Sequence, residues 1–150
     1  MDNPILTELK KHIGKPYQNI RSAAGGHLAY TIKEIDHGTV TLTMEVRDIL
    51  TNPSKQLHGG MMAMLIDEAC GLAFYTQGVS TIYSTLNLSI DYLHSAFLGE
   101  TITAKARAIK TGKKIANIHC EVLNSSDVLL AFGTTNLANT LKEIPSSLIS

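Results

Sequence analysis

Two neighbouring carboxylates, Asp67 and Glu68, are the only charged residues in the apolar stretch 61–75. An unpaired carboxylate inside a protein is costly, so Asp67 needs a partner, a water-filled cleft or a chemical role. Consecutive helix positions point about 100° apart, so the two carboxylates cannot face one site equally. Spacing alone does not choose between them, and a salt-bridged structural aspartate is an equal alternative.

A histidine and two glycines, residues 58–60, come directly before this stretch. Glycine permits a tight turn and lets another molecule approach the backbone closely. If a helix starts here, its free amides carry partial positive charge and are able to hold an oxyanion. A glycine-rich helix entry without function explains the same residues, and His58 fits a base, an orienting or a packing role.

Other chemical motifs are absent from the sequence. The six histidines lack metal-ligand spacing, and there is no nucleophile elbow or phosphate-cradling glycine loop. We therefore expect no metal ion. Cys70 and Cys120, without a CxxC pair, are typical of free buried thiols. Lys110, Lys113 and Lys114 flank a glycine turn, and either form a solvated turn or grip the phosphates of a nucleotide-bearing substrate.

The composition fits one globular domain over residues 1–150. Hydrophobic residues make up 44% and charged residues 17% of the chain, which excludes a disordered protein. Basic and acidic residues balance at 13 each, whereas a nucleic-acid-binding protein shows a basic excess. There is no signal-peptide pattern and no apolar run of the roughly 18 residues that a membrane helix needs. We expect a cytoplasmic, self-associating protein that contacts neither nucleic acid nor membrane.

Apolar periodicity predicts the elements that position these residues. In the N-terminal segment 1–25, Asn3-Pro4 is typical of a helix start and Gly14 of a helix end. Residues 15–26 contain prolines and glycines and predict a loop. The apolar residues of the first helix share one face: Ile5, Leu6, Leu9 and Ile13.

The rest of the chain alternates in the manner of strands, except for one helix. Two strands around the turn 36–38 predict a hairpin over residues 28–46. Residues 61–75 predict a helix that is apolar nearly all the way round and therefore buried. Four more strands are expected at 85–92, 101–110, 114–124 and 127–139, before a short tail at 140–150. This order predicts an α+β fold, a curved antiparallel sheet of about six strands wrapped around one long central helix.

Taken jointly, these features resemble the hotdog-fold acyl-CoA thioesterases, specifically the phenylacetate-pathway type. The resemblance spans residues 26–139. Its motifs are Asn52, the run LHGGMMAMLID at 57–67, TLNLSIDYL at 85–93, the turn 98–100 and the turn 110–113. It implies a single hotdog domain with thioesterase activity.

The resemblance also implies roles for individual residues. Asp67 matches the nucleophile or general base, and the Gly59 amide would polarise the thioester carbonyl. Thr85 would help to place the attacking water. Asn52 and His58 complete the expected catalytic set. Substrate-binding residues are expected at Gly60, Met61, Lys110, Lys113 and Lys114.

A homodimer with shared active sites follows from the same resemblance. Its two sheets would join edge to edge, with Asn52 and Gly59 from one subunit facing Asp67 and Thr85 of the other. Two such dimers would form a homotetramer. The chain departs from its relatives after Tyr92, where the expected proline is missing, and this leaves the acyl pocket undefined.

The expected function is hydrolysis of an acyl-CoA thioester to a free carboxylic acid and CoA. No separate cofactor is expected, because coenzyme A is part of the substrate. Two alternatives remain: an acyl-thioester hydratase or dehydratase of the same fold, and a non-catalytic acyl-CoA-binding protein. The sequence leaves open the acyl group, the choice between CoA and a carrier protein, and whether Asp67 attacks directly or activates water.

Overall fold

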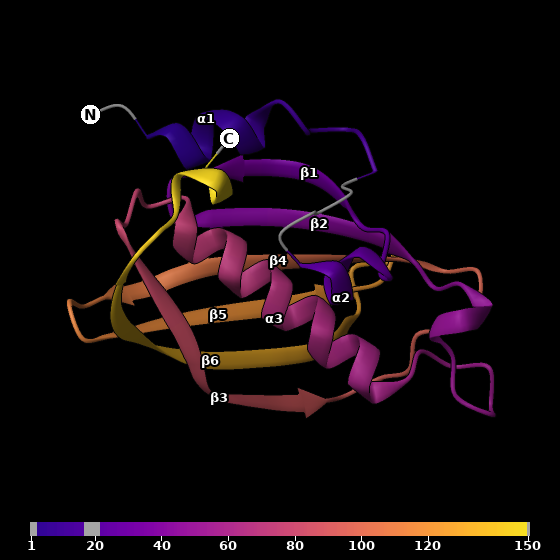
Figure 1. The fold of residues 1–150 in the computed structure, drawn as a ribbon. Helices are drawn as coiled ribbons and strands as arrows, with labels where there is room; N and C mark the ends of the chain where they lie inside the picture. The colour runs from indigo at the N-terminus through magenta and orange to yellow at the C-terminus, as the bar shows by residue number, and fades with distance from the viewer. Residues whose placement is uncertain (1–2, 17–21, 150) are drawn as a thin grey trace.

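One antiparallel sheet curves around a long helix in the computed structural model, which describes residues 3–16 and 22–149 (Figure 1). The sheet order is β1-β2-β4-β5-β6-β3, and every neighbouring pair is antiparallel. The strands are β1 Thr31–Asp36, β2 Thr39–Glu45, β3 Thr81–Tyr92, β4 Thr101–Thr111, β5 Ile115–Leu123 and β6 Leu129–Glu143. The α+β architecture predicted from the sequence is confirmed.

The central helix α3, Gly59–Tyr75, lies across the concave side of the sheet (Figure 1). It begins two residues before the predicted start, because His58 caps it with a side-chain hydrogen bond. Its core-facing residues are Met62, Leu65, Ile66, Ala69, Cys70, Ala73 and Phe74. The opposite face is open in the single chain, with Gly60 and Asp67 exposed and Gly71 half-buried, so the predicted burial holds for one face of the helix.

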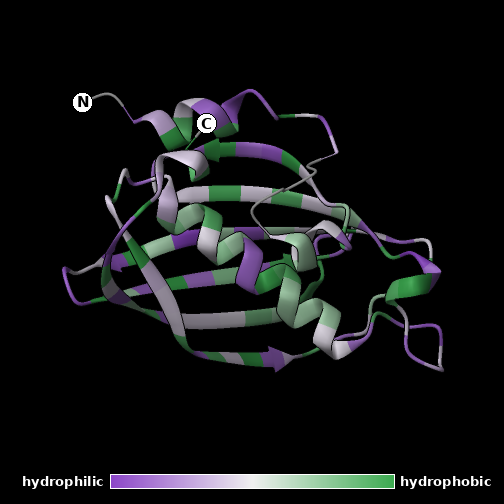
Figure 2. Cartoon of the chain, viewed as in Figure 1, coloured by the Kyte–Doolittle hydropathy of each residue, from purple (hydrophilic) through white to green (hydrophobic). Residues whose placement is uncertain are grey.

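A glycine in β6 lets α3 approach the sheet closely. A Cβ atom on Gly133 would lie 2.6 Å from Cγ2 of Ile66, which real Cβ contacts do not show. Both residues are buried. The helix therefore packs against the backbone of β6 at this point. Figure 2 shows one hydrophilic stretch in the middle of α3.

The first helix, α1 Pro4–Lys10, is shorter than predicted. Asn3 caps it, accepting a hydrogen bond from the Leu6 amide over 3.1 Å. The chain then turns, and Gly14, at φ +77°, donates its amide to the carbonyl of Ile32 over 2.9 Å. Ile13 consequently leaves the apolar face and is 41% exposed.

The predicted loop 15–26 contains a helical turn, α2 Ala23–Gly26, while residues 17–21 lie outside the described part. The Ser22 side chain caps α2 by accepting from the Gly25 amide over 3.0 Å. A further turn follows, with Ala29 at φ 50°, so β1 starts at Thr31 rather than at residue 28. Sequence periodicity does not detect a single capped turn of small residues.

The later boundaries differ from prediction in two places. The strand β3 begins at Thr81, before the predicted 85, and β6 continues to Glu143, into the predicted tail 140–150. After β6 comes a short 3-10 helix, η2 Ser146–Leu148. An earlier one, η1 Asp48–Leu50, precedes the loop that leads to α3. Cys70 and Cys120 are free and buried, as predicted.

Within residues 3–16 and 22–149, no helix combines the length and apolar character needed to cross a membrane.

Candidate active site

Asp67 projects from the open face of α3, in the middle of the helix, and its side chain is exposed in the single chain. The hydroxyl of Thr85 in β3 donates a hydrogen bond to Oδ1 of Asp67 over 3.2 Å. The structure thus brings together two of the predicted catalytic residues, which lie eighteen positions apart in the sequence.

A β-bulge in β3 gives Thr85 this direction. Thr85 pairs with Leu137 and Asn87 with Asn136, so Leu86 is an extra residue in the strand. Simple alternation places Thr85 on the face opposite Leu88. The bulge resets the alternation, and Leu86 is left 59% exposed while Thr85 faces α3.

Glu68 points away from Asp67 toward the N-terminal segment. Its carboxylate accepts from the Ser22 hydroxyl over 2.6 Å and from the Tyr30 hydroxyl over 3.0 Å. A Cβ on Gly25 would collide with the same carboxylate. Glu68 therefore joins α3 to α2 and to the start of β1. Spacing left the two carboxylates equivalent, whereas the structure engages Glu68 in two side-chain hydrogen bonds and leaves Asp67 on the exposed face of α3.

The first turn of α3 keeps one amide available. His58 Nδ1 accepts from the Gly60 amide over 2.9 Å, and the His58 carbonyl accepts from Met61 and Met62 over 2.9 and 3.0 Å. Within the described residues, the Gly59 amide has no hydrogen-bond partner. The Gly59 carbonyl accepts from the Tyr92 hydroxyl over 2.9 Å. His58 thus acts as the helix cap, and the Gly59 amide is left for a ligand.

Asn52 lies in the loop before α3, where Thr51 pairs with Leu57. Its Oδ1 accepts from the amides of Ser54 and Gln56 over 3.0 and 3.2 Å. The side-chain oxygen therefore shapes the loop. The Nδ2 group has no partner in the part of the chain that the structure describes, and it is available for a substrate oxygen.

Gly59 and Asp67 lie on one rigid helix, eight residues apart. At 1.5 Å per residue, about 12 Å of helix axis separates them. One thioester carbonyl is too small to contact both residues of the same helix. One chain therefore carries two separate candidate half-sites, one at the start of α3 and one in its middle.

The predicted phosphate-binding lysines surround the turn between β4 and β5, and all three are exposed. The Tyr83 hydroxyl fixes this turn by donating to the carbonyls of Gly112 and Lys113, each over 3.2 Å. Thr111 donates to Gln77, just past the end of α3. The β4–β5 turn therefore lies beyond the C-terminal end of α3. Gly60 and half-buried Met61 lie at the opposite end, in the first helical turn of α3. One chain does not bring these two sets together.

A cavity of about 310 Å³ opens beside Asp67. Its polar residues at this end are Ser22, Asp67, Glu68 and Thr85. Its other walls are mainly apolar side chains from α1, α3, β3, β6 and the C-terminal segment. Sequence reasoning missed Ser22 and Tyr30, because no pattern connects them to a carboxylate more than thirty-five residues away.

No group of three or more histidine, cysteine or acidic side chains among the described residues is arranged to hold a metal ion.

A carboxylate on a long helix, wrapped by one antiparallel sheet and lying beside an apolar cavity, defines the hotdog class of thioester-handling proteins. The family profile of the Thioesterase superfamily matches residues 55–131, which contain α3, β3, β4, β5 and the start of β6. The chain belongs to this superfamily.

Curated relatives agree with this assignment. The chain is 30% identical over 115 residues to the acyl-coenzyme A thioesterase PaaI of Escherichia coli, covering 77% of this chain and 79% of that protein. It is 31% identical over 105 residues to human acyl-coenzyme A thioesterase 13, covering 68% and 75%.

Solved structures agree as well. A Streptococcus mutans protein bound to acetyl CoA superposes with a TM-score of 0.75 at 26% identity, over 85% of this chain and 98% of that one. The E. coli PaaI structure gives a TM-score of 0.72 at 28% identity, over 77% and 87%. The hotdog fold predicted from the sequence is confirmed.

Proposed function

We propose that this protein hydrolyses acyl-CoA thioesters, with Asp67 as the catalytic carboxylate. The observation that carries the proposal is the Asp67 carboxylate, hydrogen-bonded by Thr85 at the polar end of a mainly apolar cavity. The acyl-CoA thioesterases among its relatives and the acetyl CoA bound to a similar structure support this substrate class.

The reaction needs only a base, an oxyanion donor and water. In one route, Asp67 accepts a proton from a water molecule while the water oxygen attacks the carbonyl carbon. In the other route, a carboxylate oxygen of Asp67 attacks the carbonyl carbon to form an anhydride, which water then hydrolyses. The Gly59 amide donates to the oxyanion. The carbon–sulfur bond then breaks. The departing thiolate then takes up a proton. Because the pKa of a simple thiol is roughly 8.5, the thiolate leaves without a strong general acid.

The two half-sites require a second copy of the chain. In the proposed dimer, Asp67 faces Gly59 and Asn52 of the partner subunit. The sheet edge supports this arrangement, because β3 is an edge strand with exposed Leu86 and Tyr92, and exposed Leu93 follows it directly. The other edge, β1, is packed against α1 (Figure 1). Edge-to-edge pairing of two β3 strands covers these groups.

Three further expectations belong to this proposal. The lysines 110, 113 and 114 bind phosphates of CoA, after dimerisation brings them toward Gly60 and Met61 of the other chain. Two dimers assemble into a tetramer. The enzyme works in the cytoplasm and needs no cofactor, since the chemistry uses only side chains, backbone and water.

Thiol release from a panel of acyl-CoA esters tests the function. The wild type should release free CoA, and Asp67→Asn should lower kcat by at least about 100-fold, the usual contribution of a general base. Asp67 is exposed, so the variant should keep its melting temperature. Glu34→Gln is the matched control, because Glu34 is an exposed carboxylate in β1 that does not line the cavity, and this variant should retain most activity. Hydrolysis by Asp67→Asn at the wild-type rate would contradict the assignment.

A further inference from the structure

The cavity beside Asp67 has a polar mouth and an apolar end. The residues Asp67, Glu68, Ser22 and Thr85 form the mouth. The cavity then continues past Gly71 and Leu72 of α3 toward the two chain ends. This polarity matches a thioester carbonyl at the mouth with its acyl chain in the interior.

The far wall is built by the terminal segments. Ile5 and Leu9 of α1 form one part, and Ile144 and Leu148 of the C-terminal segment form the other. All four lie outside residues 55–131, the part shared with the superfamily profile. The superfamily profile therefore does not include this wall.

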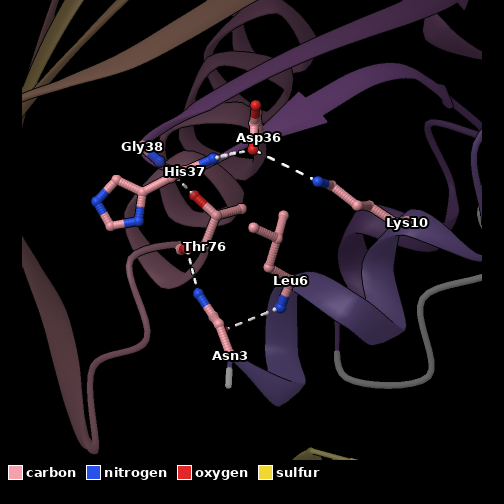
Figure 3. A network of polar contacts seen from close by, with 7 residues as sticks. All are labelled: Asn3, Leu6, Lys10, Asp36, His37, Gly38 and Thr76. Atoms are coloured by element: carbon pink, nitrogen blue, oxygen red, sulfur yellow. Dashed lines mark hydrogen bonds and ion pairs between the residues drawn. The ribbon is translucent and has the colours of Figure 1, made fainter. Parts of the chain in front are cut away.

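The α1 part of the wall is fixed in place (Figure 3). The Asn3 side chain donates to the carbonyl of Thr76, the C-cap of α3, over 2.5 Å. At the other end of α1, Lys10 pairs with Asp36 over 3.4 Å. Thr76 in turn accepts from the Gly38 amide over 2.8 Å. These contacts tie α1 to both α3 and the β1–β2 turn, so the α1 part of the wall is held in place.

The C-terminal part is tied less strongly. The Ile144 amide donates to the Ser80 carbonyl over 3.0 Å, which holds the start of the segment. Leu148 is 36% exposed, and its segment lies beside α1 (Figure 1). Leu148 is therefore the wall residue that substitution changes with least effect on the core.

We propose that this terminal wall selects the acyl group by length, an inference that rests on the proposed thioesterase function. A cavity of about 150 Å³ takes up benzene, so the cavity of about 310 Å³ holds roughly twice as many carbon atoms, about twelve. The substrate is an apolar acyl group, straight or aromatic, that ends at Leu148 and Ile144. Longer chains meet the wall.

Two variants change the cavity in opposite directions. Leu148→Ala opens the wall. Gly71→Leu narrows the cavity, because a Cβ on Gly71 has no atom within 4 Å and the helix gains a better helix former. Val128→Ala is the matched control, since Val128 has a similar exposure of 38% and does not line the cavity.

The measurement is kcat/KM for straight-chain esters from butanoyl-CoA to palmitoyl-CoA, below micelle-forming concentrations. The wild type should be most active on medium-length chains. Leu148→Ala should raise the palmitoyl-to-octanoyl ratio about tenfold, and Gly71→Leu should lower octanoyl relative to butanoyl by a similar factor. Val128→Ala should change neither ratio.

The outcomes separate the two proposals. If the wild type hydrolyses acyl-CoA and Asp67→Asn does not, but both cavity variants keep the wild-type ratios, the length selection is wrong and the function stands. If the wild type releases CoA neither from these esters nor from an aromatic acyl-CoA, both proposals fail.

Discussion

The Thr85 hydroxyl and the Asp67 carboxylate meet over 3.2 Å, across the space between β3 and α3. A hydroxyl that donates to a carboxylate keeps its own lone pairs free to accept from a water molecule. In the proposed mechanism, Thr85 orients Asp67 and offers a second contact for the attacking water. This pair is the part of the candidate site that one chain completes by itself.

Replacing Thr85 should lower activity without unfolding the protein. Thr85→Val removes a hydrogen bond to a charged group, worth about 1.5–3 kcal/mol, so kcat/KM should fall roughly 10- to 100-fold. Thr85→Ser keeps the hydroxyl and should stay within a few-fold of wild type. Equal thiol-release rates for the Val and Ser variants would argue against a role for the hydroxyl.

The proposed oxyanion donor allows a substitution that removes only the amide hydrogen. Gly59 is the first residue of α3, where proline is tolerated, and His58 already has the extended backbone that precedes proline, at φ −61° and ψ 134°. Gly59→Pro should fold and lose about 100- to 1,000-fold in kcat.

Gly59→Ala is the control for that experiment. Its Cβ would lie 3.7 Å from the Tyr92 ring, an ordinary contact, and its amide remains. Activity of Gly59→Ala should stay far above that of Gly59→Pro. If both variants lose the same activity, the side chain rather than the amide is responsible.

Mixing two inactive variants tests the shared site. Asp67→Asn and Gly59→Pro chains, refolded together, should recover about a quarter of wild-type activity, because half of the randomly paired dimers are mixed and each carries one intact site. Each variant refolded alone should stay inactive. If mass spectrometry detects mixed dimers but the mixture is inactive, the two half-sites do not combine into one active site.

Replacing Gly133 should lower the free energy of unfolding. Gly133→Ala brings a methyl group against Cγ2 of Ile66, a branched atom that cannot swing away, so we expect a loss of about 1–3 kcal/mol in the free energy of unfolding. Urea titration measures it. Adding Ile66→Ala removes the colliding atom, so the double variant should lose less than the sum of the two single changes.

The buried thiols predict a pH effect. A hydrogen bond with Cys70, and then burial, raise the pKa of Cys120 well above its ordinary value. Above the unfolded thiol's pKa of about 8.5, the folded chain holds a proton that the unfolded chain has lost, so this contribution to stability falls as pH rises.

Thermal melts between neutral and alkaline pH measure this effect. At neutral pH, the melting temperature of Cys120→Ala should be lower than that of wild type, because removing the sulfur atom leaves a void in the core. It should then fall less steeply than that of wild type as the pH rises. Parallel curves would contradict the raised pKa. Native protein should also react slowly with a thiol reagent and rapidly once unfolded.

Much of the fold was predictable because periodicity records which side of an element is buried. The six strands and the central helix follow from alternation and residue type, and their bounds were mostly right to within a few residues. The helical turn α2 was missed, because it depends on a Ser22 cap and a distant carboxylate, neither of which leaves a periodic pattern.

The site was less predictable, because it depends on local irregularity. Alternation puts Thr85 on the outer face of β3, and only the bulge at Leu86 turns it toward Asp67. Spacing also left Asp67 and Glu68 equivalent, whereas the hydrogen bonds from Ser22 and Tyr30 engage Glu68. The resemblance favoured Asp67 and Thr85, and their catalytic roles stay predictions.

Because Gly59 and Asp67 are separated along α3, the proposed reaction requires a dimer, and activity should therefore depend on protein concentration. In the proposed mechanism, a solitary subunit holds the base of one reaction centre and the oxyanion donor of another, so we expect it to be inactive. Specific activity should consequently fall on dilution below the dissociation constant of the dimer, and adding an Asp67→Asn chain should rescue some of it by supplying the missing amide.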